Sequence, residues 1–272
     1  MPPVSQQIQG NGQGQTAHRR TGRVPFRQGS GRMTYETFGL TNAGRSRENN
    51  EDALRVEPEL NLIVVADGMG GESCGEVASA LVVDKIVEYI RCPAETLEPE
   101  ERIKEAIRLA NRVVWNAAED HGECKGMGST VVVAYWEDDR LWIVNVGDSR
   151  AYRFRNGQLT QLSYDQNVGN DLRTNLGLSE EQVQRYPHHR LLTMAVGIGE
   201  DVLIRTWSGD LAPGDLIFLC SDGFYGPIPD SRLAEFLSSR MPLPAMMASM
   251  IEAANSAGGP DNITVAVLKA EV

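Results

Sequence analysis

Several residues and patterns that mark whole classes of protein are scarce in this sequence. Its 272 residues include four cysteines, none of them in a C-x-x-C pair, which argues against a zinc knuckle and a redox dithiol motif. A disulfide framework is not expected in a chain of this length. No apolar run approaches the roughly 18 residues of a membrane helix, and the N-terminal residues lack the apolar segment of a secretory signal. These absences predict a cytoplasmic protein with no membrane partner.

Basic side chains are in the minority. The chain carries 26 Lys and Arg against 37 Asp and Glu, a formal net charge of −11. Residues 1–33 hold five arginines and no acid, so residues 34–272 are left with 21 basic and 37 acidic side chains. A protein this acidic is a poor nucleic-acid binder, because binding to nucleic acid needs a basic face. We therefore expect no nucleic-acid partner.

Several catalytic patterns occur only in incomplete form. "GMGGES" is close to a dinucleotide-binding loop, but Ser73 takes the third glycine position and Asp67 would repel a pyrophosphate. "GDSRA" is close to a nucleophile elbow at Ser149, but its last glycine is missing. No cysteine is followed by arginine six residues later, and none of the four lysines lies in a Gly-Lys-Ser/Thr loop. Dinucleotide, serine-hydrolase, cysteine-phosphatase and P-loop chemistry are therefore disfavoured.

The sequence divides into a tail and one large domain. Residues 1–33 are rich in Gln, Gly and Arg and poor in apolar side chains, which predicts a disordered tail that is either inert or bound to an acidic partner. Residues 34–272 read as two strands, two long helices, a run of short strands that includes 202–207, two more helices and a last strand. Strands linked by hairpins, with helices in two separate groups, predict an α+β fold of packed antiparallel sheets covered by helices.

Apolar periodicity marks the helices. The first has five apolar residues on one predicted face, namely Val77, Ala80, Val83, Val87 and Ile90. Four methionines on the late helices, at 241, 246, 247 and 250, are predicted to fill the core. The insertion 168–190 contains a capping box formed by Ser179 and Gln182.

Acidic residues stand at the ends of several predicted strands. The apolar run Leu62–Ala66 is followed by Asp67 and Gly68, and the same strand–Asp–Gly order recurs at Asp222. Four more acids occupy comparable positions: Asp148, Asp261, Glu51 and Asp52. If these strand ends converge, the carboxylates would repel one another unless cations lay between them.

The residue types indicate which cations these are. The four histidines lie outside the acid motifs, and the pair His188 and His189 is expected in an exposed loop. Ligand sets made only of oxygen favour Mg²⁺ or Mn²⁺ over zinc or copper. Glycine beside Asp67 has no Cβ, so the Gly68 carbonyl can also reach a metal ion. Two ions about 3.5–4 Å apart can lower the pKa of a shared water and direct it at phosphorus. Asp67 is therefore the predicted bridging ligand.

The motifs resemble those of the metal-dependent serine/threonine protein phosphatases of type 2C, in their bacterial form. They run in family order through residues 34–272: "R-x-x-N-E-D", "DGMGG" followed by "GEVAS", "GSTVVV", "VGDSR", "SDG" and "GPDNITV". The resemblance implies a four-layer αββα sandwich with two Mn²⁺ or Mg²⁺ ions at one end, and a flap at about 168–190 that tunes substrate choice. It also implies hydrolysis of phosphoserine and phosphothreonine in proteins by a metal-bridging water. A cognate serine/threonine kinase and a monomeric state are further expectations.

The resemblance also implies a role for each acid. Asp67 would bridge both ions, with Asp222 and Asp261 completing one site. Glu51 and the Gly68 carbonyl would serve the other site, and Asp52 would support it through bound water. Asp148, with Asp222, would hold a third and weaker metal. Arg47 would bind the substrate phosphate with its guanidinium; the alternative is a surface arginine paired with Glu48 or Glu51.

The sequence departs from the family pattern at a few positions outside the proposed ligand set. Gln166 stands where many members have His, Met194 where they have Arg, and Glu72 where they have His. Met69 replaces the histidine that eukaryotic members offer as general acid, which leaves the proton donor unassigned. The rival interpretation is a pseudophosphatase that keeps the sandwich as a binding module. That interpretation would be favoured by missing metal acids, and here all are present.

Overall fold

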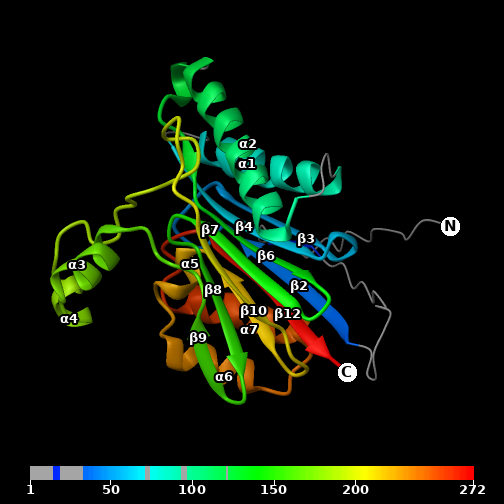
Figure 1. Ribbon diagram of the computed structural model, residues 1–272. Helices are drawn as coiled ribbons and strands as arrows, with labels where there is room; N and C mark the ends of the chain where they lie inside the picture. The colour runs from blue at the N-terminus through cyan, green and yellow to red at the C-terminus, as the bar shows by residue number, and fades with distance from the viewer. Residues whose placement is uncertain (1–14, 19–32, 71–73, 93–96, 121) are drawn as a thin grey trace.

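Two antiparallel sheets lie face to face at the centre of the molecule, and helices cover both outer faces (Figure 1). The computed structural model describes residues 15–18, 33–70, 74–92, 97–120 and 122–272. The first sheet has six strands in the order β1-β2-β12-β11-β8-β9. Their bounds are β1 Gln15–His18, β2 Thr34–Asn42, β12 Ile263–Glu271, β11 Leu216–Cys220, β8 Arg150–Arg155 and β9 Gln158–Gln161.

The second sheet has the order β10-β7-β6-β4-β3, with the short strand β5 paired to β4. Its strands are β10 Arg205–Asp210, β7 Arg140–Val146, β6 Val131–Glu137, β4 Leu62–Met69, β3 Asp52–Glu57 and β5 Gly128–Ser129. β4 pairs antiparallel with each of its neighbours. The strand before "GMGGES" therefore does not belong to the parallel βαβ unit that a dinucleotide-binding fold requires.

The helices form two groups on opposite faces and one projecting pair. α1 Cys74–Arg91 and α2 Pro99–Asp120 lie on the outer face of the second sheet, while α5 Asp222–Tyr225, α6 Asp230–Ser238 and α7 Leu243–Ser256 cover the first (Figure 1). α3 Val168–Leu176 and α4 Glu180–Gln184 stand out to one side. Two single-turn 3-10 helices, η1 Pro58–Leu60 and η2 Gly122–Cys124, complete the elements.

Three buried apolar clusters separate the layers. One packs α1 and α2 on the second sheet and includes Val82, Ile86 and Ile107. A second lies between the sheets, and a third packs the late helices on the first sheet. The order of layers is helix, sheet, sheet, helix, which confirms the predicted α+β fold and its four-layer αββα sandwich. Met246, Met247 and Met250 are core residues as predicted, whereas Met241 is 39% exposed.

Some local expectations need correction. Val83, Val87 and Ile90 of the predicted α1 face are buried. Val77 is 46% exposed, because Ala78 and Ser79 take the buried positions of its turn. The strand expected over 202–207 is displaced, since the ladder between β10 and β7 pairs Arg205 to Asp210 with Asn145 to Arg140. Val202 and Ile204, which precede β10, pack instead against the apolar cluster that α1 and α2 form with the second sheet.

The predicted tail is also not wholly without structure. Within 1–33, residues 15–18 form β1 and pair with β2, with Gln15 opposite Asn42 and His18 opposite Gly39. The expectation of disorder for residues 1–14 and 19–32 lies outside the described residues.

The expectation of no disulfide was wrong for one cysteine pair. Cys74 and Cys124 are bonded, while Cys92 and Cys220 are free thiols. The two bonded residues are 50 positions apart in the chain, so local spacing gave no sign of the pairing.

Candidate metal centre

The predicted acids gather at one end of the sandwich, where strands of both sheets begin or end. Asp52, the first residue of β3, lies directly opposite Asp67 in the ladder with β4. A hydrogen bond of 2.7 Å from the Ser221 hydroxyl to the Asp52 carboxylate links this pair to the other sheet, at the end of β11. Asp222 begins α5 directly after Ser221, and Asp261 precedes β12. The convergence expected from the sequence is therefore present.

Asn262 ties the early acid segment to the late one. Its side-chain oxygen accepts the Glu51 amide at 2.8 Å. Its side-chain nitrogen donates to the carbonyls of Ala43 and Asn49 at 3.0 and 2.8 Å. One amide side chain thus holds the backbone of Glu51 beside Asp261. Asn262 was not among the predicted site residues, although it lies within the motif "GPDNITV".

Gly68 and Gly75 allow two segments to approach closely around Glu51. A Cβ on Gly68 would lie 2.0 Å from the Gly75 carbonyl oxygen and 2.7 Å from the Glu51 carbonyl oxygen. The Gly68 amide donates to that Glu51 carbonyl at 3.1 Å. A Cβ on Gly75 would lie 2.8 Å from the Glu51 carboxyl carbon. A Cβ at position 68 would collide with backbone, so that position requires glycine. A Cβ at position 75 would instead press on the Glu51 side chain and shift its carboxylate.

The backbone of Asp67 is fixed by the segment that leads into β6. The Asp67 amide donates to the Thr130 hydroxyl at 3.0 Å, and the Asp67 carbonyl accepts from the Thr130 amide at 2.8 Å and from the Ser129 hydroxyl at 3.0 Å. Thr130 also shares a hydrogen bond of 2.7 Å with Ser149. Ser149 is fully buried, so it holds the framework and is not an exposed nucleophile.

Burial and mutual repulsion make the acids hard to ionise. Burial, opposed in part by hydrogen bonds from Thr264 and Ser221, raises the pKa of Asp52 to about 7. Burial and the charge of Asp222 raise the pKa of Asp148 to about 7. Burial and the neighbouring carboxylates hold the pKa of Asp67 well above its ordinary value.

Two other acids share this behaviour. Burial, then the charge of Asp261, raises the pKa of Asp222, and burial raises the pKa of Glu51 although nearby Arg47 opposes it. One carboxylate oxygen of Asp52 and one of Asp222 are buried without any hydrogen-bond partner. Buried acids without donors are costly, and bound cations would relieve both the repulsion and the missing contacts.

The acids are not already set at metal-binding geometry. Among the residues that the structure describes, no three histidine, cysteine or carboxylate side chains are arranged so that they could hold an ion. Protein donors engage several carboxylates instead: Arg47 contacts Asp261 at 3.0 Å and Asn167 contacts Asp148 at 2.9 Å. The donor set still fits Mg²⁺ or Mn²⁺, because it consists of oxygens and includes buried ones with no other partner.

Arg47 contacts the acid cluster through a partner that the sequence did not suggest. It pairs with Asp261 and not with Glu48 or Glu51, the partners of the alternative interpretation. Its side chain is 49% exposed, so it can turn from Asp261 towards a ligand outside the acid cluster.

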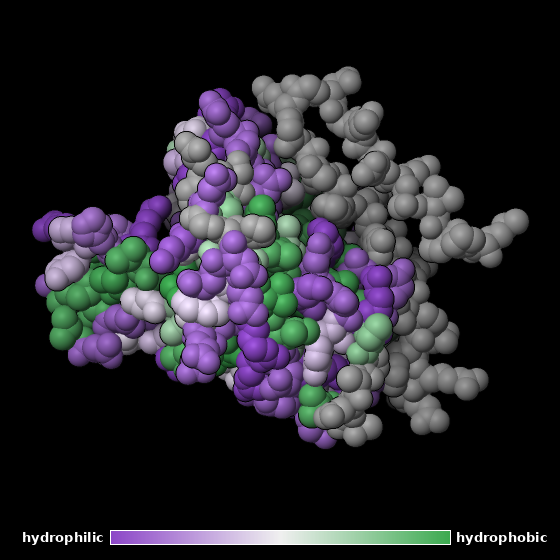
Figure 2. Space-filling view, turned by 90° about the horizontal axis from the view of Figure 1, so that it is seen from above, coloured by the Kyte–Doolittle hydropathy of each residue, from purple (hydrophilic) through white to green (hydrophobic). Residues whose placement is uncertain are grey.

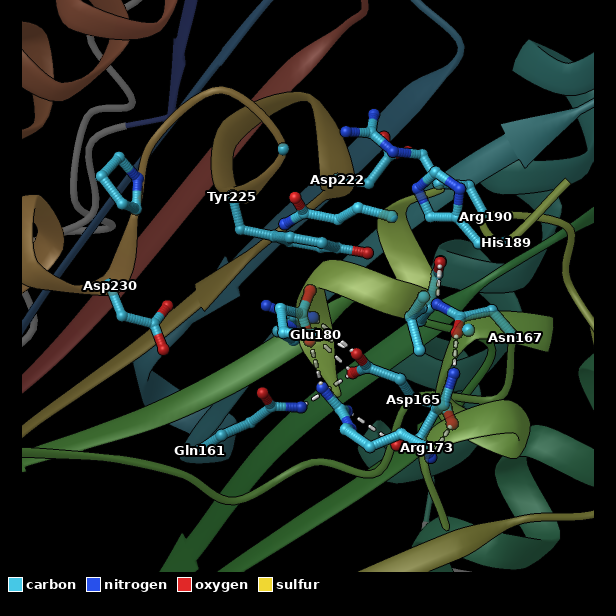
Figure 3. A pocket seen from close by; sticks show the side chains of 18 of the residues that line it. Gln161, Asp165, Asn167, Arg173, Glu180, His189, Arg190, Asp222, Tyr225 and Asp230 are labelled. Carbon is cyan, nitrogen blue, oxygen red and sulfur yellow. Dashed lines mark hydrogen bonds and ion pairs between the residues drawn. The ribbon is translucent and has the colours of Figure 1, made fainter. Parts of the chain in front are cut away.

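A pocket of about 860 Å³ extends from the acids to the segment 168–190, which we call the flap. Figure 3 shows Asp222, Tyr225 and Asp230 around the same space as the flap residues Arg173, Glu180 and His189. The capping box of α4 is present as predicted. His188 is exposed as expected, whereas His189 is half-buried and lines the pocket. The flap thus borders the same space as Asp148 and Asp222.

Asn167 joins the flap to the acids and was missed in the sequence. Its side-chain nitrogen donates to Asp148, while its side-chain oxygen accepts from the Asn170 amide at 2.9 Å and caps the start of α3. Capping asparagines are common, so only the contact with Asp148 distinguishes this one. That contact spans 19 residues of sequence.

The residues that depart from the family pattern have structural partners or apolar surroundings. Gln166 accepts the Gly147 amide at 2.7 Å and donates to the Leu203 carbonyl at 2.8 Å, which fixes the loop before Asp148. Met194 and Met69 line a smaller hollow of about 220 Å³. Glu72 lies outside the described residues.

A family model described as protein phosphatase 2C matches residues 41–267. The chain belongs to the protein phosphatase 2C family. It is 32% identical over 238 residues to the serine/threonine phosphatase stp of Listeria monocytogenes, covering 85% of this chain and 94% of that protein. It is 33% identical over 248 residues to the serine/threonine protein phosphatase PstP of Mycobacterium tuberculosis, covering 86% of this chain and 46% of PstP.

Solved structures of the protein phosphatase 2C type share the fold. A crystal structure of Mycobacterium tuberculosis PstP superposes with a TM-score of 0.79 at 32% identity and covers 88% of this chain and 99% of that one. A PstP catalytic domain in complex with two manganese ions gives a TM-score of 0.78 at 29% identity, with 88% and 100% coverage. A binuclear manganese site therefore occurs in this family on the same fold.

Proposed function

We propose that this chain is a metal-dependent protein phosphatase that hydrolyses phosphoserine and phosphothreonine in proteins. The observation that carries the proposal is the cluster of buried acids with raised pKa values, in a chain of the protein phosphatase 2C family. The presence of all the expected acids argues against a pseudophosphatase. The serine/threonine phosphatases among its relatives support the same activity.

Two Mn²⁺ or Mg²⁺ ions would be held by acids from both sheets. Asp67 would bridge them, Asp222 and Asp261 would complete one site, and Glu51 with the Gly68 carbonyl would complete the other. Asp52 would act through bound water. Asp148 and Asp222 would offer a third, weaker site. When bound, the ions supply a water of lowered pKa that attacks phosphorus, and they stabilise the charge that develops.

The chain's own residues would position the phosphate and restrict water. Arg47 would exchange its contact with Asp261 for two phosphate oxygens, because a metal ion would engage that carboxylate. The flap would lie beside the phosphorylated segment, since it borders the pocket that contains Asp148 and Asp222. Flap side chains would thereby influence which phosphoproteins are accepted.

The cellular setting is part of the proposal. We expect a monomer in the cytoplasm that reverses the action of a cognate serine/threonine kinase. No helix in the described part of the chain has the length and apolar character that a membrane span requires. The acidic composition supports neither a nucleic-acid nor a membrane partner.

Metal removal tests the function directly. Chelator treatment should abolish phosphate release from a phosphothreonine peptide, and added Mn²⁺ or Mg²⁺ should restore it. Full turnover by chelated and dialysed protein would refute the two-metal mechanism. Tight metal binding without phosphate release would instead support the pseudophosphatase.

The tail 1–33 should be dispensable for the chemistry, because its sequence contains no acid ligand. Removing it should leave kcat on a small aryl phosphate essentially unchanged, even though β1 is lost from the edge of its sheet. A large fall in kcat with an unchanged circular dichroism spectrum would show that the tail contributes to the site.

A further inference from the structure

The disulfide between Cys74 and Cys124 lies beside the proposed metal centre. The two Cα atoms are 5.4 Å apart, and the bond joins the first residue of α1 to the end of η2. Cys92 is exposed and Cys220 is buried, and neither is bonded.

On one side, Cys74 begins the segment that supports Glu51. The next residue, Gly75, approaches the Glu51 carboxylate so closely that a Cβ would lie 3.0 Å from either of its oxygens. One turn later, the Ser79 hydroxyl donates to the Glu51 carbonyl at 2.6 Å. The first turn of α1 therefore sets the position of Glu51.

On the other side, Cys124 begins the segment that supports Asp67. The Met127 amide donates to the Cys124 carbonyl at 3.0 Å, and β5 follows at once. β5 pairs Gly128 with Met69 and Ser129 with Gly68. Ser129 and Thr130 then hold the backbone of Asp67. The disulfide thus clamps together the two segments that position the proposed ligands Glu51, Asp67 and Gly68.

We propose that Cys74–Cys124 is a redox-modification site whose opening by a dithiol reductant weakens metal binding. The inference rests on the proposed function, because it concerns regulation of the same metal centre. Disulfides in cytoplasmic proteins are usually transient or redox-sensing. A disulfide beside the metal ligands of a cytoplasmic enzyme therefore fits a switch better than a permanent crosslink.

The two sulfurs differ in access, which sets the direction of exchange. Cys74 is only 6% exposed, whereas Cys124 is half-buried and is followed by exposed Lys125 and Gly126. A thiolate of the dithiol attacks the Cys124 sulfur, the bond between the cysteines breaks, and Cys74 leaves as a thiolate at the start of α1, where the helix dipole stabilises it. The second thiol of the reductant then attacks the mixed disulfide and releases Cys124. The dithiol loses two electrons and becomes a disulfide, the protein gains two electrons, and protons from water restore its two thiols. Exchange with a low-molecular-weight disulfide reverses the reaction.

Opening the bond removes a covalent tie but no metal ligand. Changes in groups that orient metal ligands typically cost about 10- to 100-fold in metal affinity. We expect the reduced protein to bind Mn²⁺ more weakly than the oxidised protein within this range. The fold should persist, since three apolar clusters hold the layers together and the bonded pair belongs to only one of them.

Direct titration of Mn²⁺ into the full chain tests the switch without relying on turnover. Isothermal titration would compare oxidised protein with protein reduced by an excess of dithiol, from which the reductant is removed under anaerobic conditions. Alkylation under denaturing conditions, followed by mass spectrometry, should find two free thiols in the oxidised protein and four in the reduced protein. The reduced protein should show the weaker affinity, and reoxidation should restore it.

Variants separate the bonded pair from the other cysteines. The double substitution Cys74→Ser and Cys124→Ser should give the weaker affinity under both conditions. The control Cys92→Ser should respond to reduction as the natural chain does. The natural chain itself gives the decisive comparison if the double variant does not fold.

The outcomes distinguish this inference from the proposed function. Equal Mn²⁺ affinity before and after reduction would overturn the switch while leaving the phosphatase intact. The switch would also be overturned if the oxidised protein had four free thiols. It would be overturned as well if the number of free thiols stayed at two after dithiol treatment, since the bond would then not have opened. No Mn²⁺ binding in either state would refute the metal centre, and the switch with it.

Discussion

The two sides of the large pocket are built in opposite ways. On the acid side, Asp52, Asp67 and Asp222 are held by contacts between segments far apart in the chain, such as the bond from Ser221 to Asp52 across 169 residues. On the flap side, α3 and α4 are held mainly by local contacts, such as the Ser179–Gln182 capping box and an exposed Arg173–Glu180 ion pair. Figure 2 shows the flap extending from one side of the molecule with hydrophobic surface on it, and Leu176 there is 67% exposed.

The difference indicates where rigidity is needed. Acids that must hold cations at fixed separations depend on a rigid tertiary frame. A surface that meets varied protein substrates gains from being able to move, and exposed local contacts can open at low cost. Changes on the acid side should therefore affect chemistry, and changes on the flap side should affect substrate choice.

The largest effect is expected for Asp67→Asn. The substitution removes the proposed bridging charge, and a loss of several kcal/mol in charge stabilisation corresponds to roughly a 1000-fold fall in kcat. The metal-free variant should melt at the same or a higher temperature than the natural chain, because a buried charge repelled by its neighbours is gone. Turnover and thermal melting measured on one preparation check both points. A folded variant with normal turnover would show that the bridging ligand is another residue.

Arg47→Ala separates phosphate binding from metal binding on the acid side. Loss of charge-assisted hydrogen bonds to two phosphate oxygens should lower kcat/KM about 10- to 100-fold. Arg47→Lys should recover part of the lost kcat/KM, since lysine supplies the charge but not the planar guanidinium that bonds two oxygens at once. Mn²⁺ affinity should not fall, because Arg47 competes with metal for Asp261. Unchanged kinetics would favour a surface role, and weaker Mn²⁺ binding would favour a structural one.

A rise in pH should have two opposite effects on the acid side. It should lower the stability of the metal-free protein and raise the affinity for Mn²⁺. The pKa values of Asp52 and Asp148, raised to about 7 from an ordinary value of 3.8, mean that the folded metal-free protein holds these protons more tightly than the unfolded chain. Its stability is therefore greatest below about pH 4 for these two groups and falls as pH rises to about 7.

Metal binding requires the deprotonated acids, so Mn²⁺ affinity should rise with pH, roughly tenfold from pH 6 to 8 for each such carboxylate. Thermal melting of metal-free protein and Mn²⁺ titration across this range measure the two trends. Metal-free protein that becomes more stable from pH 5 to 8 would contradict the origin given for the raised pKa values.

The smallest effect is expected at Asn167, which connects the acid side to the flap through its contact with Asp148 and its cap on α3. Asn167→Ser keeps a good helix cap for α3 but is too short to reach Asp148. We expect this variant to show a several-fold rise in KM for a phosphopeptide with little change in kcat on an aryl phosphate. That result would show that Asn167 orients the flap. Asn167→Asp, which keeps the cap but places two carboxylates together, should be the more disruptive change. Equal effects of both variants on both substrates would indicate a purely structural asparagine.

Motifs with local chemical meaning were readable in the sequence. Apolar runs followed by Asp-Gly predicted the strands that lead to Asp67 and Asp222, although β4 continues past Asp67 to Met69 and Asp222 begins α5. Hairpin-linked strands predicted the antiparallel sandwich. The capping box at Ser179 was predictable because capping depends on residues three apart. These features follow from backbone geometry over a few residues, so composition and spacing suffice to predict them.

Contacts between distant segments were decided only by the tertiary structure. No local pattern indicates that Asn262 supports Glu51, that Asn167 contacts Asp148, or that Arg47 pairs with Asp261. The Cys74–Cys124 bond is the clearest case, since a disulfide was not expected in a chain of this length and the two cysteines are 50 positions apart. By itself the sequence determined which residues carry charge and which segments form strands. The packing of two sheets determined which charges meet, because burial and proximity exist only once strands distant in the chain lie side by side.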